Sequence, residues 1–185
     1  MEITNLEIPD VKLLKPEVFS DSRGTFYESF NEKIFQEHIG KEVKFVQDNH
    51  SVSKKNVLRG IHFQKDPFSQ GKLIRVVSGC VIDVAVDLRK KSKTFGEWVS
   101  QEISGENNHQ LWIPEGFGHA FIVKSEYAHF LYKTTNFYNK DSEGCIKWDD
   151  EFLNIDWQTS KSKIIVSEKD EEGQSFKKFL NENIF

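Results

Sequence analysis

The stretch KLIRVVSGCVIDVAVDL, residues 72–88, decides the fold class of this chain. It contains two runs rich in β-branched residues, which meet at Ser78-Gly79, a dipeptide typical of a hairpin or a tight corner. In the second run, Ile82, Val84, Val86 and Leu88 share one face of a strand, whereas the alternate residues include Asp83 and Asp87. The stretch therefore predicts two strands, the second with one apolar and one mixed face.

The rest of the chain shows the same β signal. Similar runs occur at residues 97–103, 110–113, 120–123 and 130–134. Helices are expected only over residues 31–38, after an asparagine cap, and over residues 175–181, where three apolar side chains share a face. Many short strands without βαβ alternation predict a mainly all-β fold, an antiparallel β-barrel with a few short peripheral helices. Such a barrel can hold a small ligand in its mouth.

Composition narrows the classes of function. The 185 residues contain no internal repeat, low-complexity tract or linker, so we expect a single domain over residues 1–185. A formal net charge of −4 does not favour nucleic acid or an anionic membrane as a partner. No apolar run has the length of a membrane span, so a cytoplasmic protein is expected, with Cys80 and Cys145 as small core residues.

A second stretch, NVLRGIHFQ at residues 56–64, places Arg59 and His62 among residues typical of a buried strand. A fixed cation and a titratable imidazole have little reason to lie there unless they face a ligand. Strict alternation would put these two side chains on opposite faces of the strand. If both face one ligand, a bulge or local twist is required, and Gly60 is its natural position.

A metal centre is not expected from the histidines. The segment PEGFGH, residues 114–119, has the spacing of the second cupin motif, in which the histidine is a metal ligand. The first cupin motif needs His-x-His, and the corresponding stretch here is His62-Phe63-Gln64. Because one imidazole of the usual ligand set is missing, we predict no metal and no cofactor.

Taken together, the motifs resemble the dTDP-4-dehydrorhamnose 3,5-epimerase family. They are NVLRGIHFQ, Gln70-Gly71-Lys72, DVAVDLRKKSKTFG, IPEGFGHAF, LYK and VSEKD, in this order between about residues 21 and 170. The resemblance implies a metal-free, cupin-type jelly roll that forms a homodimer. It also implies an isomerase that inverts C3 and C5 of a dTDP-linked 4-keto-6-deoxy sugar, in deoxysugar production for cell-surface polysaccharide.

The resemblance also implies catalytic roles. Proton abstraction beside a ketone needs a base, a stabiliser of the enolate oxygen and an acid on the opposite face. His62 matches the base, Asp170 the carboxylate that orients it, and Lys72 the cation beside the enolate. Tyr132 matches the acid. His119 is expected to hold the substrate or the enolate oxygen, and Asp83 to assist.

The remaining matches concern substrate binding. Arg23 and Arg59 match the contacts to the diphosphate, because guanidinium groups bind phosphate oxygens with two donors. The positions expected around the nucleotide are Phe19, Glu28, Gln47, Asn49 and Tyr138, and Glu143 is expected near the sugar.

Three alternatives stay open. The chain has Gly118 and Ala120 around His119 where the family pattern has alanine and glycine, and this exchange could shift the histidine and restrict inversion to C3 or to C5. A metal-dependent cupin isomerase or oxygenase would need bound metal. A non-catalytic sugar-binding barrel would need the loss of the base or the acid, and both residue types are present.

Overall fold

The computed structural model of the chain describes residues 1–182. Its strands are β1 (Glu2–Asn5), β2 (Lys12–Lys15), β3 (Val18–Asp21), β4 (Gly24–Tyr27), β5 (Gln47–Lys54), β6 (Leu58–Gln64), β7 (Lys72–Ser78), β8 (Cys80–Asp87), β9 (Trp98–Ser104), β10 (Gln110–Ile113), β11 (Phe117–Val123), β12 (Tyr127–Thr134) and β13 (Glu143–Cys145). Its helices are α1 (Glu32–His38), α2 (Glu168–Glu171) and α3 (Phe176–Phe179), with 3₁₀ turns at Lys140–Ser142 and Lys161–Lys163.

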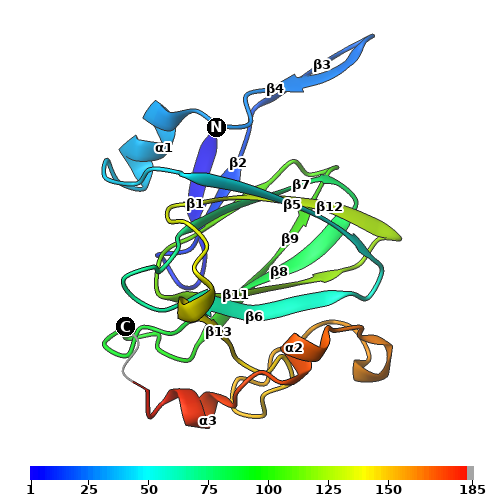
Figure 1. The fold of residues 1–185 in the computed structure, drawn as a ribbon. Helices are drawn as coiled ribbons and strands as arrows, with labels where there is room; N and C mark the ends of the chain where they lie inside the picture. The colour runs from blue at the N-terminus through cyan, green and yellow to red at the C-terminus, as the bar shows by residue number, and fades with distance from the viewer. Residues whose placement is uncertain (183–185) are drawn as a thin grey trace.

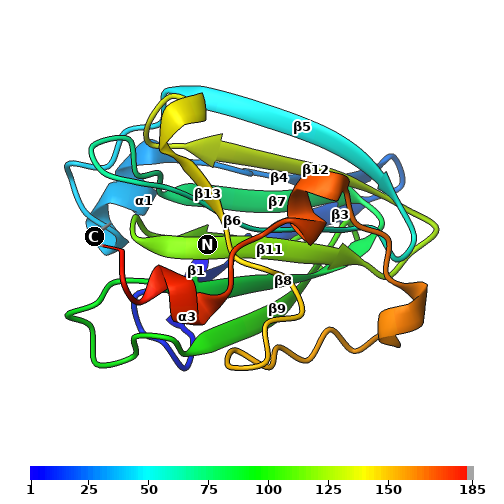
Figure 2. The same ribbon diagram turned by 60° about the horizontal axis from the view of Figure 1, so that its bottom comes forward.

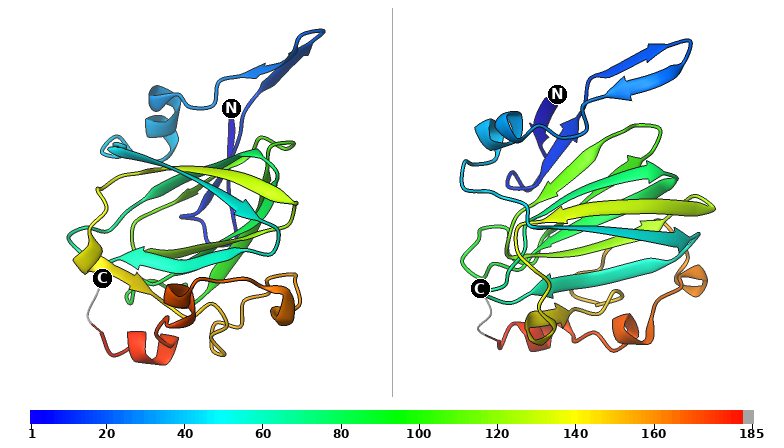
Figure 3. Two further views of the ribbon diagram at one scale, coloured as in Figure 1. Left: turned by 45° about the vertical axis from the view of Figure 1, so that its right-hand side comes forward. Right: turned by 45° about the horizontal axis from the view of Figure 1, so that its top comes forward.

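Two antiparallel sheets face one another as the layers of a jelly roll (Figures 1 and 3). The six-stranded sheet has the order β1-β2-β10-β7-β12-β5, and the five-stranded sheet has the order β13-β6-β11-β8-β9. Sequence neighbours often lie in different sheets, so pairing is mostly between segments distant in the chain. The predicted mainly all-β, jelly-roll fold with short peripheral helices is confirmed.

The dipeptide Ser78-Gly79 is a corner between the two sheets and not a hairpin. Strand β7 pairs with β10 and β12, whereas β8 pairs with β9 and β11. Gly79 has φ +85°, and a Cβ atom built on it would lie 2.0 Å from the carbonyl oxygen of Tyr127. Only glycine fits this corner, because any other side chain would collide with the backbone of β12.

Strand β8 separates two apolar cores, whereas its alternation predicts one apolar and one mixed face. Ile82, Val84 and Val86 pack under the C-terminal segment, which crosses the outer face of the five-stranded sheet (Figure 2). Val81 and Ala85 face the space between the sheets, together with Phe121 and Phe130. The mixed face of β8 therefore points into the barrel, and this orientation carries Asp83 inside.

The helices are short and lie outside the barrel, α1 beside the N-terminal strands and α2 and α3 over the outer face of the five-stranded sheet (Figures 1 and 2). Helix α1 begins after Asn31, whose side chain caps Ile34 N at 3.2 Å, and it buries Phe35 against Trp112. It lies where the sequence predicts it. Helix α3 is shorter than predicted and spans Phe176–Phe179 after the Ser175 cap. Helix α2 was not predicted, because its sequence is an acidic run typical of a solvated loop.

The hairpin of β3 and β4 extends away from the barrel (Figures 1 and 3). Its aromatic side chains are exposed, Phe19 by 56% and Phe26 by 73%. Both cysteines are partly exposed and free, so the expectation that they are core residues is wrong. Within residues 1–182, no helix is long and apolar enough to cross a membrane.

Candidate active site

A cavity of about 330 Å³ lies between the two sheets. Residues of β5, β6, β7, β11 and β12 line it, together with Gln70, which precedes β7, and with Tyr138 and Glu143 at its mouth. The lining comprises Asn49, His50, Ser51, Arg59, His62, Phe63, Gln64, Gln70, Lys72, His119, Phe121, Phe130, Tyr132, Tyr138 and Glu143. Most of the predicted site residues therefore converge on one place, although they are spread over nearly a hundred positions of the sequence.

His62 is held by a carboxylate from the C-terminal segment. Its Nε2 lies 2.5 Å from Oδ1 of Asp170, which is buried at the start of α2. Burial would raise the pKa of Asp170, but the hydrogen bonds from His62 and Ser167 outweigh it and hold the pKa below its ordinary value. The carboxylate is therefore charged and keeps a proton on Nε2. This leaves Nδ1 as the ring nitrogen available for proton transfer.

His119 forms a second imidazole–carboxylate pair deeper in the barrel. Its Nε2 lies 3.0 Å from Oδ2 of Asp83, and both side chains are buried. Burial is the main influence on both groups, raising the pKa of Asp83 and lowering that of His119. His119 is also the cross-strand partner of His62. The two imidazoles therefore belong to the same wall of the cavity, that of the five-stranded sheet.

Lys72 and Tyr132 come from the opposite wall, on β7 and β12 of the six-stranded sheet. Burial lowers the pKa of Lys72 to about 8, although the charges of Asp83 and Glu143 oppose this shift. Burial also raises the pKa of Tyr132, so its hydroxyl stays protonated at neutral pH. The Lys72 ammonium lies 6.0 Å from the centre of the Tyr132 ring. A cation and a proton donor thus face the histidine wall across the cavity.

The predicted bulge at Gly60 is present. His62 opposes His119 and Arg59 opposes Phe121, so three steps along β6 match two steps along β11. The extra residue brings Arg59 and His62 to the same cavity despite their odd spacing. A Cβ atom on Gly60, whose φ is +122°, would lie 2.5 Å from the carbonyl oxygen of His119. Glycine is therefore required where the two strands approach most closely.

The mouth of the cavity carries a small polar network. The Tyr138 hydroxyl donates to Oε2 of Glu143 at 2.9 Å, and the ammonium of Lys169 lies 2.5 Å from the same oxygen. Burial would raise the pKa of Glu143, but the bonds from Lys169 and Tyr138 lower it below its ordinary value. On the other side, Gln47 donates to Asn49 at 2.9 Å and accepts from the backbone of Tyr138.

Three predicted binding residues lie away from this cavity and, within residues 1–182, form no hydrogen bond with its lining residues, unlike Gln47 at the mouth and Asp83 behind His119. Phe19 and Arg23 line a separate hollow on the β3–β4 hairpin, where Arg23 pairs with Asp21 at 2.6 Å in full exposure. Glu28 follows the same hairpin and is exposed. Within one copy of the chain, the structure does not bring these three side chains to His62.

Several cavity residues were not predicted, although the sequence carries a signal for some of them. Phe121 and Phe130 stack with their ring centres 4.0 Å apart, and period-2 alternation from His119 and Tyr132 points to both. Gln64 is different, because its amide bonds the backbones of Phe68, Phe137 and Asn139. The contacts to Phe137 and Asn139 are long-range, so the glutamine of NVLRGIHFQ positions the mouth segment and needs no ligand to explain its burial.

The two small residues exchanged relative to the family pattern lie on the side of β11 that faces away from the cavity. Gly118 and Ala120 alternate with His119 and face the core between β11 and the C-terminal segment. A Cβ atom on Gly118 would lie 2.6 Å from Cγ2 of Ile61. The local packing therefore requires glycine at this position, and His119 keeps its bond to Asp83 in its presence.

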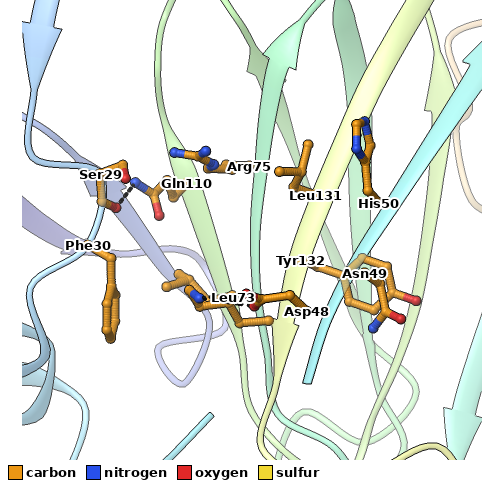
Figure 4. A pocket seen from close by; sticks show the side chains of 11 residues that line it. Ser29, Phe30, Asp48, Asn49, His50, Leu73, Arg75, Gln110, Leu131 and Tyr132 are labelled. Atoms are coloured by element: carbon orange, nitrogen blue, oxygen red, sulfur yellow. Dashed lines mark hydrogen bonds and ion pairs between the residues drawn. The ribbon is translucent and has the colours of Figure 1, made fainter. Parts of the chain in front are cut away.

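A second hollow, of about 370 Å³, lies mainly on the outer face of the six-stranded sheet (Figure 4). Its floor consists largely of residues of β5, β7 and β12 whose side chains point away from the inner cavity, including Asp48, Arg75 and Leu131. One edge is closed by Gln110, which donates to the carbonyl oxygen of Ser29 at 2.6 Å. The imidazole–carboxylate pairs do not line it, so the inner cavity is the candidate active site.

The fold and the cavity define a cupin-type barrel with a site for acid–base chemistry. One wall offers an imidazole backed by a carboxylate, and the other offers a phenol and an ammonium. A family model described as dTDP-4-dehydrorhamnose 3,5-epimerase matches residues 5–178. The chain belongs to this family.

Individual relatives agree with the family model. A dTDP-4-dehydrorhamnose 3,5-epimerase of Shigella flexneri is 54% identical over 176 residues, covering 95% of this chain and 96% of that protein. The crystal structure of a dTDP-6-deoxy-D-glucose-3,5-epimerase from Legionella pneumophila, in complex with dTDP-4-keto-L-rhamnose, superimposes with a TM-score of 0.91 at 45% identity, covering 95% of this chain and 93% of that one.

A more distant neighbour has a narrower activity. The structure of a 3'-monoepimerase from Streptomyces bikiniensis, in complex with dTDP-quinovose, superimposes with a TM-score of 0.88 at 30% identity, covering 94% of this chain and 87% of that one. The same barrel therefore serves enzymes that invert one position as well as enzymes that invert two.

Proposed function

We propose that the chain is a dTDP-4-dehydrorhamnose 3,5-epimerase, which inverts C3 and C5 of a dTDP-linked 4-keto-6-deoxy sugar. The observation that carries this proposal is the placement of His62 and Tyr132 on opposite walls of one cavity. Inversion beside a ketone requires removal of a proton from one face of the sugar and return of a proton to the other. A base and an acid that face each other across a bound ring meet that requirement.

In this mechanism, Nδ1 of His62 accepts the carbon-bound proton. Asp170, bonded to Nε2, keeps the imidazole in the required tautomer and stabilises the imidazolium that forms. The electron pair moves onto the C4 oxygen as an enolate. Lys72 stabilises this negative charge together with His119, whose orientation Asp83 maintains. Tyr132 then donates its phenolic proton to the carbon from the opposite wall.

The diphosphate is placed at Arg59, which lies in the same cavity and whose Nε donates to Ser53 at 3.1 Å. Tyr138 is 54% exposed at the mouth, where its ring can stack on the thymine base, with Gln47 and Asn49 beside it. Glu143 lies between this mouth and His62 and belongs to the sugar end. Strands β5 to β12 and the segment that follows them would therefore bind the substrate from its thymine base to its reacting carbons.

A homodimer accounts for the residues that lie outside the cavity. Phe19 and Arg23 project on an exposed hairpin, away from their own barrel. In a two-fold assembly the hairpin of one copy reaches the partner's mouth, where an arginine and an aromatic ring would complete the nucleotide site, with Glu28 close by. Light scattering tests the dimer, and mixing Arg23→Ala with His62→Ala subunits should restore turnover if sites are shared.

The decisive experiment is mass spectrometry of dTDP-4-keto-6-deoxyglucose incubated with the protein in D₂O, with a chelator-treated sample alongside. Uptake of two deuterons in both samples supports inversion at C3 and C5 without a metal. Uptake of one indicates a single-position epimerase, the activity of the Streptomyces bikiniensis neighbour. Absence of uptake, with His62→Ala as the matched blank, would refute the proposal for this substrate.

Two broader features accompany this proposal. We expect residues 1–185 to act as one domain in the cytoplasm, where nucleotide sugars are made. Intact activity of the purified chain without added partners tests whether it acts as a single domain. Fractionation of cells tests the cytoplasmic location.

A further inference from the structure

Cys145 lies beside the candidate base on the neighbouring strand. Strand β13 pairs with β6 so that Cys145 is the cross-strand partner of His62. Its Sγ lies 4.0 Å from Oδ1 of Asp170, the oxygen that also bonds Nε2 of His62. An imidazole nitrogen, a thiol sulfur and a carboxylate oxygen thus lie within 4.8 Å of one another. None of the proton-transfer steps described above uses the thiol.

We propose that His62, Cys145 and Asp170 form an inhibitory binding site for Zn²⁺ or a similar thiophilic divalent cation. The inhibition rests on the proposed epimerase function, but the binding does not. Nitrogen, thiolate and carboxylate are the donors that zinc prefers, and three protein ligands with a fourth position for water are a common zinc arrangement. A thiolate in the set selects zinc over magnesium or calcium, which prefer oxygen ligands.

The geometry requires only small adjustments. Zinc bonds of about 2.0–2.3 Å in a tetrahedron separate neighbouring ligand atoms by about 3.3–3.8 Å. The Cys145–Asp170 distance of 4.0 Å is close to this range. The His62–Asp170 distance of 2.5 Å must increase by roughly 1 Å, within the reach of side-chain rotation. The strand pairing of β6 with β13 and the Ser167 cap of α2 hold the three backbones in place.

Occupation of this site would disable the base through its tautomer. In the metal-free protein, Asp170 keeps the ring proton on Nε2, so Nδ1 has a lone pair for the substrate. A cation on Nε2 takes the place of that proton, and the single N–H of the neutral imidazole then resides on Nδ1. The thiol proton leaves to solvent as the Zn–S bond forms. Nδ1 can then no longer accept a proton from the substrate.

Direct oxidation of the thiol is a weaker explanation for its position. Burial raises the pKa of Cys145 to about 12, so the nucleophilic thiolate is scarce at neutral pH. A metal ion, by contrast, supplies its own positive charge to displace the proton.

The first test measures binding without reference to turnover. Co²⁺ is added to the metal-free protein as a spectroscopic substitute for zinc, and displacement by ZnCl₂ is followed. We expect a thiolate-to-cobalt charge-transfer band that disappears in Cys145→Ala and Cys145→Ser and persists in Cys80→Ala, which removes the chain's other cysteine. Absence of the band in the unmodified protein, or its persistence in both Cys145 variants, would overturn the site.

The second test measures inhibition by buffered ZnCl₂ in the deuterium-uptake assay. The unmodified protein and Cys80→Ala should be inhibited alike, with MgCl₂ having no effect. Cys145→Ala should keep its basal turnover and need at least about 10–100 times more free zinc for the same inhibition, since loss of a residue that only supports a ligand already costs that much. Equal inhibition of Cys145→Ala would refute the proposal. A cobalt band that depends on Cys145, in a protein without epimerase turnover, would support the site and reject only the proposed function.

Discussion

Replacement of Lys72 by methionine should make the protein more stable and far less active. Methionine keeps the length of the side chain but removes the ammonium. Lys72 is only 9% exposed, and burial lowers its pKa from the ordinary 10.5 to about 8. Each pKa unit corresponds to about 1.4 kcal/mol, so the charged form at neutral pH costs the folded state about 3 kcal/mol relative to the unfolded chain.

The expected gain in stability is below this full amount. The pKa of about 8 already includes the favourable charges of Asp83 and Glu143, but it refers to a neutral amine, and methionine lacks the hydrogen-bonding capacity of that amine. We therefore expect an increase of about 1–3 kcal/mol in the free energy of unfolding at pH 7, and roughly 2–12 °C in Tm for a chain of this size. Turnover should fall by about 10²–10³, the usual cost of removing one preorganised donor to an oxyanion.

The pH dependence of stability and turnover provides a second test of the lowered pKa of Lys72. Between about pH 8 and 10.5, the unfolded chain holds a proton on Lys72 that the folded state has lost. The stability of the unmodified protein should therefore rise with pH in this window, and the advantage of Lys72→Met should shrink. Turnover should fall over the same range, because the neutral amine cannot stabilise the enolate.

Urea unfolding at pH 7 and pH 10, with deuterium uptake at each pH, measures both effects. Lys133→Met is the matched control, because Lys133 lies on the outer face of the same sheet and pairs with Asp48 at the surface. It should change stability by no more than about 0.5 kcal/mol. Equal or lower stability of Lys72→Met at pH 7, or a gain that is unchanged at pH 10, would refute the argument from burial.

Three further substitutions separate the remaining roles. Asp170→Asn should lower kcat by about 10–150-fold, since a hydrogen bond to a charged group contributes about 1.5–3 kcal/mol. The affinity for dTDP, measured by calorimetry, should stay unchanged. A decrease in kcat of threefold or less would contradict the role of the carboxylate. Tyr132→Phe should allow deuterium uptake through His62 with retention of configuration, and NMR that instead detects inverted product would exclude Tyr132 as the acid. Arg59→Ala should raise KM about 10–100-fold with little change in kcat, and an unaltered KM would remove it from the diphosphate site.

Local sequence patterns were sufficient for the class of fold. The alternation in β8 correctly assigns Asp83 to the inside of the barrel, because adjacent side chains of a strand point to opposite faces whatever the topology. The asparagine cap correctly marks the start of α1. The bulge at Gly60 was inferred from the need to bring Arg59 and His62 together, and the register of β6 against β11 confirms it.

The sequence by itself determined a mainly β barrel and, through ordered motifs, the family and the residues to examine. Local patterns could not determine which of them meet, because strand pairing joins segments far apart in the chain, and only the family resemblance paired Asp170 with His62. Asp170 reaches His62 across 108 positions, from an acidic run whose local pattern predicts only solvent exposure. Tertiary structure alone placed Cys145 beside the base and kept Phe19 and Arg23 outside the cavity, since both outcomes depend on how sheets and hairpins pack in space.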